Sequence, residues 1–153
     1  MKSLARRSDA EEVLRRLRRL NRENAPRWGR MSAHQMVCHL GDAFRVAMGE
    51  MRSSDRSSLP YRTVIKWIAL YAPLRWPGGI PTTPELDQSA GRGTPPGDFA
   101  TDVARVEALV GAITAGSIDL GRQRHPLFGT MSHAAWLRWG YLHMDHHLRQ
   151  FDA

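Results

Sequence analysis

Apolar residues recur at three- and four-residue intervals in four stretches of the chain, the spacing that places them on one face of an α-helix. The first stretch follows Ser8-Asp-Ala-Glu11, which has the form of a capping box, and its apolar positions are Val13, Leu14, Leu17 and Leu20. We expect this helix to run from Ser8 to about Asn24, because Pro26 ends it.

Three further long helices are expected. The second begins at Ser32, with Gln35 at the capping-box position, and extends to about Ala47. The third runs from about Asp98 to Ala115 and has one apolar stripe, and the fourth runs from Ser132 to the C-terminus. A short helix is expected at 62–71.

The connections determine the predicted fold class. Residues 50–60 are polar and rich in serine, and residues 73–97 are rich in proline and glycine and therefore irregular. No stretch alternates convincingly between apolar and polar residues as a strand does. The sequence therefore predicts an all-α protein, a four-helix bundle with a long insertion between its second and third helices, in a single domain over 1–153. The insertion is a candidate cover for a functional site.

A five-residue pattern occurs twice, 100 residues apart. Trp28-Gly-Arg-Met-Ser32 and Phe128-Gly-Thr-Met-Ser132 each place an aromatic-glycine turn before a helix, methionine at N′ and serine at the N-cap. The partner of each methionine one turn into the helix is Met36 or Trp136. We expect the second and fourth helices to begin by the same capping mechanism.

Composition restricts the class of protein further. A chain of 153 residues with five tryptophans can bury a core, and a single cysteine, Cys38, excludes an internal disulfide. The start of the chain has no apolar signal-peptide region, and no apolar run is long enough to cross a bilayer. A cytoplasmic protein without a membrane partner is the expectation.

The formal net charge of +7 is concentrated in residues 1–30, which hold ten basic and four acidic residues. Arg15, Arg18, Arg19 and Arg22 share one side of the first helix, and such a face attracts phosphates. Acidic neighbours and the absence of a DNA-reading motif favour a solvated helix face, so we expect no nucleic-acid partner.

The histidines carry the candidate chemistry. His143 and His147 are four residues apart and project from the same face of the last helix, where two imidazoles can chelate a metal ion. His39, within an apolar segment of the second helix, is a candidate third ligand, and three imidazoles with an open position are typical of catalytic zinc. Hydrogen-bonded core histidines are the alternative interpretation. A zinc protease is excluded because Met144 occupies the position of the catalytic glutamate.

These residues also carry a family resemblance. Trp28-Gly-x-Met-Ser, Met36-x-x-His39 and His143-x-x-x-His147-x-x-Gln150 resemble the DinB-like (DinB/YfiT) superfamily, in an uncharacterised branch. The resemblance implies a four-helix bundle, often a homodimer, whose metal ligands are His39, His143 and His147 and whose divalent ion is zinc or nickel.

The resemblance further implies an activity, that of a metal-dependent S-transferase, which transfers a low-molecular-weight thiol to an electrophilic small molecule. A non-catalytic bundle stabilised by its metal is the alternative. In that case Asp42, His146 or Gln150 would complete the metal shell.

Other polar residues have simpler expected roles. Gln150 is expected either to orient an imidazole or to lie at the surface. Asp42 is expected either to orient His39 or to pair with an arginine. Asp145 is expected to pair with Arg149 at the surface, and Cys38 to be a small buried residue. His34 and His133, in the first turns of their helices, are expected to be exposed.

Overall fold

The structure, a computed structural model, describes residues 1–80 and 82–153, and within them it is mostly helical. Its α-helices are α1 (Arg7–Arg19), α2 (Ala33–Met48), α3 (Lys66–Tyr71), α4 (Phe99–Thr114) and α5 (His133–Gln150). A π-helical turn, Tyr61–Ile65, precedes α3, and 3-10 turns cover Pro84–Leu86, Gln88–Ala90 and Leu120–Arg122. Two short strands, β1 (Arg124–His125) and β2 (Gly129–Thr130), pair antiparallel with His125 opposite Gly129.

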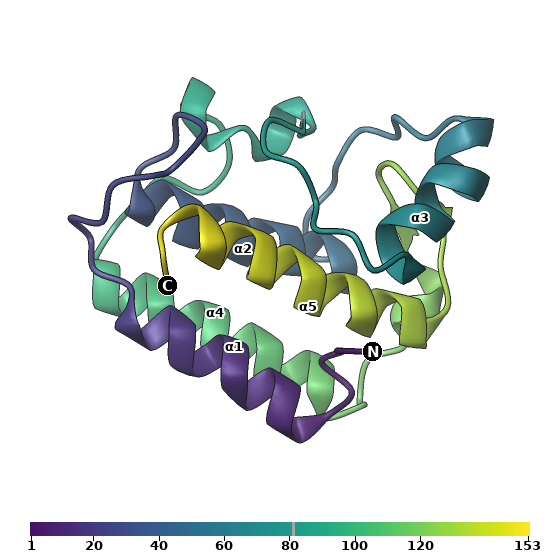
Figure 1. The fold of residues 1–153 in the computed structure, drawn as a ribbon, viewed down its shortest axis with the longest axis horizontal. Coiled ribbons are helices and arrows are strands. Elements are labelled where there is room, and N and C mark those ends of the chain that lie inside the picture. The colour runs from purple at the N-terminus through teal and green to yellow at the C-terminus, as the bar shows by residue number, and fades with distance from the viewer. Residues whose placement is uncertain (81) are drawn as a thin grey trace.

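The four long helices pack against one another, and this arrangement brings α2 and α5 together. Helix α2 contacts α4 and α5, and α1 contacts the same two helices (Figure 1). The irregular segment 73–97 and α3 lie on the other side of α2 and α5 from α1 and α4. The core between the helices is apolar, and its fully buried side chains include Leu17, Met36, Leu40, Phe44, Trp136, Met144 and Leu148.

The two related helix starts have the same geometry, as the repeated pattern predicts. The Ser32 side chain accepts a hydrogen bond from the Gln35 backbone, and Gln35 completes the capping box by bonding back to the Ser32 backbone N–H. Ser132 accepts from the backbone N–H of Ala135 in the same way. Gly29 and Gly129 both have positive φ, +79° and +65°, a conformation that favours glycine and turns the chain into each helix.

The first helix differs from its prediction at both ends. Ser8 is not its cap, because the helix already begins at Arg7 after a turn in which the Arg6 N–H bonds to the Ser3 carbonyl. It ends at Arg19, and Asn24 lies in a separate turn with Asn21, whose backbone N–H bonds to the Asn24 side chain. Asparagine side chains compete in this way with helical hydrogen bonds.

The connections contain more local order than the pattern indicates. The 3-10 turns at Pro84–Leu86 and Gln88–Ala90 lie within segment 73–97, whose Pro81 is outside the described residues. The ribbon of β1 and β2 is also absent from the prediction, since two residues are too short to alternate. Among the helices described here, none is both long and apolar enough to cross a bilayer.

Candidate metal centre

Three histidines from two helices meet on one side of the packed helices. His39 lies on α2, and His143 and His147 lie one turn apart on α5. One ligand atom from each residue lies within 4.8 Å of the other two. The structure therefore brings together the three residues that the sequence proposes as metal ligands.

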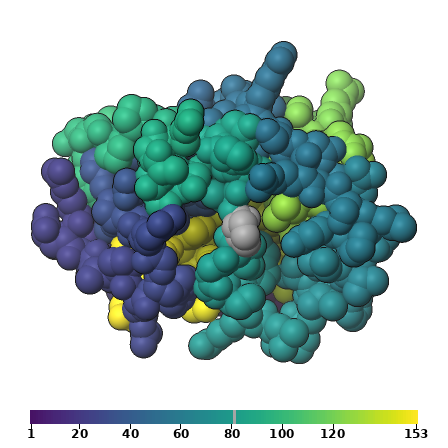
Figure 2. All heavy atoms as spheres, turned by 90° about the horizontal axis from the view of Figure 1, so that it is seen from above, coloured from purple at the N-terminus to yellow at the C-terminus, as the bar shows by residue number. Residues whose placement is uncertain are grey.

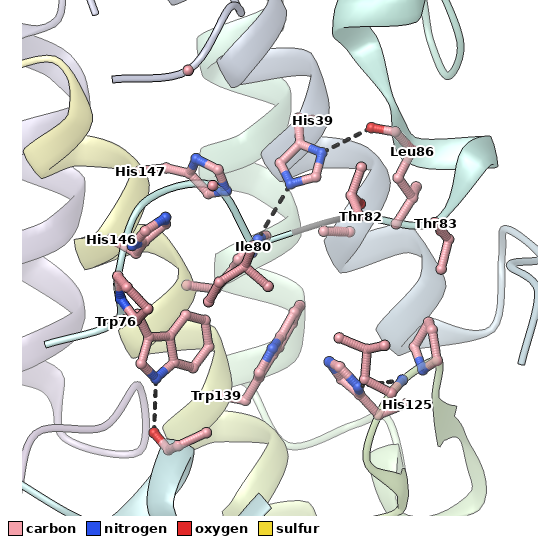
Figure 3. A pocket seen from close by; sticks show the side chains of 18 of the residues that line it. His39, Trp76, Ile80, Thr82, Thr83, Leu86, His125, Trp139, His146 and His147 are labelled. Carbon is pink, nitrogen blue, oxygen red and sulfur yellow. Dashed lines mark hydrogen bonds between the residues drawn. The ribbon is translucent and has the colours of Figure 1, made fainter. Parts of the chain in front are cut away.

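The hydrogen bond of His39 to the backbone determines which of its two nitrogens carries the lone pair. Its Nδ1 lies 3.0 Å from the carbonyl oxygen of Leu86 (Figure 3). A carbonyl can only accept, so the proton is on Nδ1 and the lone pair is on Nε2. Segment 73–97 thus contributes to the site by fixing the ring of His39.

The tautomer of His147 follows from a chain of two hydrogen bonds. The Gln150 side chain donates from Nε2 to the carbonyl oxygen of Trp28, 2.7 Å away, which fixes the orientation of the amide. Gln150 Oε1 then accepts from His147 Nδ1 at 3.0 Å. The Nε2 of His147 is left with the lone pair, as in His39. Gln150 is therefore an orienting residue, one of the two roles that the sequence left open.

His143 completes the group and supports the fit to a metal. Its Nε2 lies 3.3 Å from His39 Nε2, and two nitrogens bound to one tetrahedral zinc at about 2.0–2.1 Å are about 3.3 Å apart. The Nδ1 of His143 is buried without a hydrogen-bond partner among the described residues. Its ring is held by stacking on Trp139, with centroids 4.7 Å apart and planes 17° apart. The donor set therefore fits a divalent ion such as zinc.

Burial keeps the three rings neutral, which metal binding requires. Burial lowers the pKa of His39, partly offset by its hydrogen bond to Leu86. Burial and the neighbouring imidazoles hold the pKa values of His143 and His147 well below the usual 6.5. Each neutral ring has one nitrogen lone pair, so no charged imidazole has to lose a proton before a metal binds.

The three histidines lie on the wall of a pocket of about 650 Å³. In Figure 2 the C-terminal helix, in yellow, is visible at the bottom of an opening framed by earlier segments of the chain. The pocket wall is largely aromatic and aliphatic and includes Trp76, Ile80, Trp136 and Trp139. A pocket of this size accepts a small organic molecule beside the histidines.

Comparison with known proteins assigns the chain to a family. The family described as "Protein of unknown function (DUF1569)" matches residues 2–153. The chain belongs to this family. No curated protein and no solved structure matches it.

Asp42 and His146 of the DUF1569 chain are not among the three converging ligands, although the His146 ring packs against that of His147, with centroids 5.0 Å apart. Asp42 accepts hydrogen bonds from the backbone and side chain of Thr94 at 2.7 and 2.6 Å, so it anchors the end of segment 73–97. His146 packs against Trp28 and Trp76, with ring centroids 5.7 and 6.0 Å away. Both residues are buried, but neither belongs to the cluster.

A second buried cluster corrects the expectation that His34 is exposed. His34 is only 4% exposed, and its Nε2 lies 2.8 Å from an Asp102 carboxylate oxygen on α4. The packing of α2 on α4 covers the first turn of α2, which the helical pattern alone does not show. Cys38 is buried beside the same carboxylate, as expected, and burial and Asp102 raise the pKa of its thiol to about 12. A thiol in this state is a packing residue and not a nucleophile.

The surface pairs follow the prediction in part. Asp145 accepts from Arg149 at 2.9 Å, as expected, and also from Arg16 of α1 at 2.7 Å. His133 is half-buried, so the expectation that it is exposed is also wrong.

The role of Gln150 gives a prediction for metal affinity. Substitution Gln150→Ala removes the acceptor that holds the His147 proton on Nδ1, so we expect zinc affinity to fall about 10- to 100-fold. Competition titration with a chromogenic chelator measures this change. Arg149→Ala is the matched control, because Arg149 is adjacent in sequence and bonds to Asp145 instead. Equal zinc affinities in the wild type and Gln150→Ala would show that Gln150 does not support metal binding.

Proposed function

We propose that the DUF1569 chain binds one divalent metal ion on His39, His143 and His147, within a DinB-like four-helix bundle formed by α1, α2, α4 and α5. The observation that carries the proposal is the convergence of three neutral imidazoles beside an open pocket. Zinc or nickel is the favoured ion, because imidazole nitrogen suits both.

We further propose that the site is catalytic, a metal-dependent S-transferase that joins a low-molecular-weight thiol to an electrophilic small molecule. A bound divalent ion lowers the pKa of a coordinated thiol or water. The pocket supports this activity over a purely structural metal, since three protein ligands would leave a coordination position open and the three histidines line space for a substrate.

The residues of the chain have separate tasks in this proposal. His39, His143 and His147 hold the ion, and the Leu86 carbonyl and Gln150 fix two of the rings. The indoles of Trp76 and Trp139 pack against His143 and form part of the pocket wall. In the transfer, sulfur bonds to the electrophilic carbon, the leaving group departs with its electron pair, and the thiol proton passes to water.

Thiol binding tests the proposed activity directly. In cobalt-loaded protein we expect 2-mercaptoethanol to produce a sulfur-to-metal charge-transfer band in the absorption spectrum, which ethanol at the same concentration does not produce. His146→Ala keeps the band and His143→Ala loses it. Metal-loaded wild type with no band at any thiol concentration would leave the non-catalytic alternative, a bundle held together by its metal.

The nucleic-acid alternative receives little support from the charges on α1. Arg18 forms a double hydrogen bond with Glu107, at 2.8 and 3.1 Å, and Arg16 bonds to Asp145. Part of the positive charge is thus paired within the chain, which weakens its attraction for phosphate.

We also propose that the chain forms a homodimer through an apolar surface around α3. Large apolar side chains are exposed there, namely Leu59, Tyr61, Val64, Ile65, Trp67, Ile68, Tyr71 and Leu74. The charged residues among them, Arg62 and Lys66, already donate within the chain, to the Ser57 hydroxyl and the Thr130 carbonyl. Large contiguous apolar patches are uncommon on monomers, and an exposed apolar face of this kind is suited to pairing with itself.

The dimer makes a prediction for Trp67, which is 62% exposed. Trp67→Glu introduces a charge into the proposed interface, so we expect it to convert the dimer to a monomer in sedimentation-velocity experiments. Arg15→Glu, on the exposed face of α1, is the control and leaves the dimer intact. A monomeric wild type at high protein concentration would overturn the proposal.

A further inference from the structure

His125 is a second polar group in the pocket, and the turn between β1 and β2 fixes its tautomer. Its Nδ1 accepts hydrogen bonds from the backbone N–H groups of Leu127 and Phe128, both at 3.1 Å. A backbone N–H can only donate, so Nδ1 carries the lone pair and the proton is on Nε2. No sequence pattern indicates this role of His125, because the tautomer depends on the turn.

Aromatic contacts hold the ring of His125 in one orientation. It stacks on Phe128, with centroids 4.6 Å apart and planes 16° apart, and it also contacts Trp136 and Trp139. His125 lines the pocket (Figure 3), and its Nε2 has no hydrogen-bond partner among the described residues. It is therefore a fixed N–H donor in largely apolar surroundings, where a hydrogen bond is stronger than in water.

The donor lies on the same wall as the three histidines. Trp139 contacts His125 at a centroid distance of 5.1 Å and stacks on His143 at 4.7 Å. One indole thus separates the His125 donor from the cluster. Burial lowers the pKa of His125 to about 3, so the ring keeps its single proton and is a donor rather than a general acid.

We propose that the Nε2–H of His125 is a subsite for the carbonyl oxygen of an uncharged small molecule whose apolar body lies against the pocket wall. This proposal rests on the proposed function in one respect, because it takes the small molecule to be the electrophile of the proposed thiol transfer. Arg30 and Arg75 also line the pocket, but the ring contacts of His125 are all aromatic. A neutral donor among aromatic rings favours an uncharged acceptor over a carboxylate, which would have to lose its hydration there. His125 is then a positioning residue for the ligand.

The test uses two probes that differ only at the acceptor, acetophenone and α-methylstyrene. Metal-free protein labelled with ¹⁵N is titrated with each, and the His125 Nε2–H resonance is followed by NMR. We expect acetophenone to bind more tightly and to shift this resonance downfield, because one hydrogen bond in such a site corresponds to about a five- to tenfold preference. Neither probe requires a metal, so a failure here is distinct from a failure of the metal site.

The variant His125→Asn separates the subsite from the structural role of the ring. An asparagine oxygen can accept from the Leu127 and Phe128 N–H groups, as in an Asx turn, but the Nε2–H is lost. We expect His125→Asn to retain a cooperative thermal unfolding transition, to lose the preference for acetophenone, and to bind α-methylstyrene as the wild type does. An equal loss of affinity for both probes in His125→Asn, or no binding of acetophenone to the wild type, would overturn the proposal.

Discussion

Purified wild-type protein is expected to contain about one equivalent of zinc or nickel by elemental analysis, and His143→Ala and His147→Ala almost none. Each variant removes one of three nitrogens that converge within 4.8 Å, and two imidazoles alone hold an ion weakly. The measurement is made on the purified proteins and repeated after reconstitution with the metal and gel filtration.

His146→Ala is the matched control for this experiment. His146 is a buried histidine next to His147 on the same helix, but it packs against Trp28 and Trp76 and lies outside the cluster. We expect His146→Ala to keep about one equivalent of bound metal, as the wild type does. Loss of metal from a folded His146→Ala as well would place His146 in the metal shell, and a wild type without metal after reconstitution would leave the histidines as packing residues.

The second prediction concerns stability in acid. The pKa of His125 is lowered by burial to about 3, whereas a histidine in the unfolded chain titrates at about 6.5. Between these values the unfolded state binds more protons, so the free energy of unfolding falls as the pH falls. The contribution of neutral His125 to the free energy of unfolding is complete above about pH 6.5 and is lost progressively toward pH 3. The loss amounts to about 3 kcal/mol between pH 7 and pH 4.

His125→Asn isolates this contribution because asparagine does not titrate. Urea unfolding of metal-free wild type and variant from pH 4 to pH 8 gives the two free energies. We expect the wild type to lose about 3 kcal/mol more than the variant between pH 7 and pH 4. Above pH 7 the difference between the two proteins should be constant. Parallel curves over the whole range would show that His125 titrates alike in the folded and unfolded states.

The sequence identifies the histidine cluster because helical periodicity is a geometric rule. His143 and His147 lie on one face of α5 for any helix with this repeat, and Gln150 extends the same face by three residues. The capping pattern at Ser32 also fixes where α2 begins, and hence the position of His39 along the helix. These local rules hold irrespective of how the helices pack.

The remainder of the site depends on contacts between distant segments. The Leu86 carbonyl reaches His39 across 47 positions of sequence, and no pattern within segment 73–97 indicates this bond. His34 is buried only because α4 brings Asp102 against it. His125 acquires its fixed tautomer from a turn formed by two-residue strands, which are too short to produce a periodic signal.

The most direct test of the central claim is X-ray absorption spectroscopy of the zinc-loaded protein before and after addition of 2-mercaptoethanol. We expect three imidazole nitrogens at about 2.0–2.1 Å with an oxygen as the fourth ligand before thiol is added, and a sulfur at about 2.3 Å once the thiol is present. Fewer than three imidazoles would contradict the metal centre. Three imidazoles in a shell that never admits sulfur would contradict the thiol chemistry proposed for it.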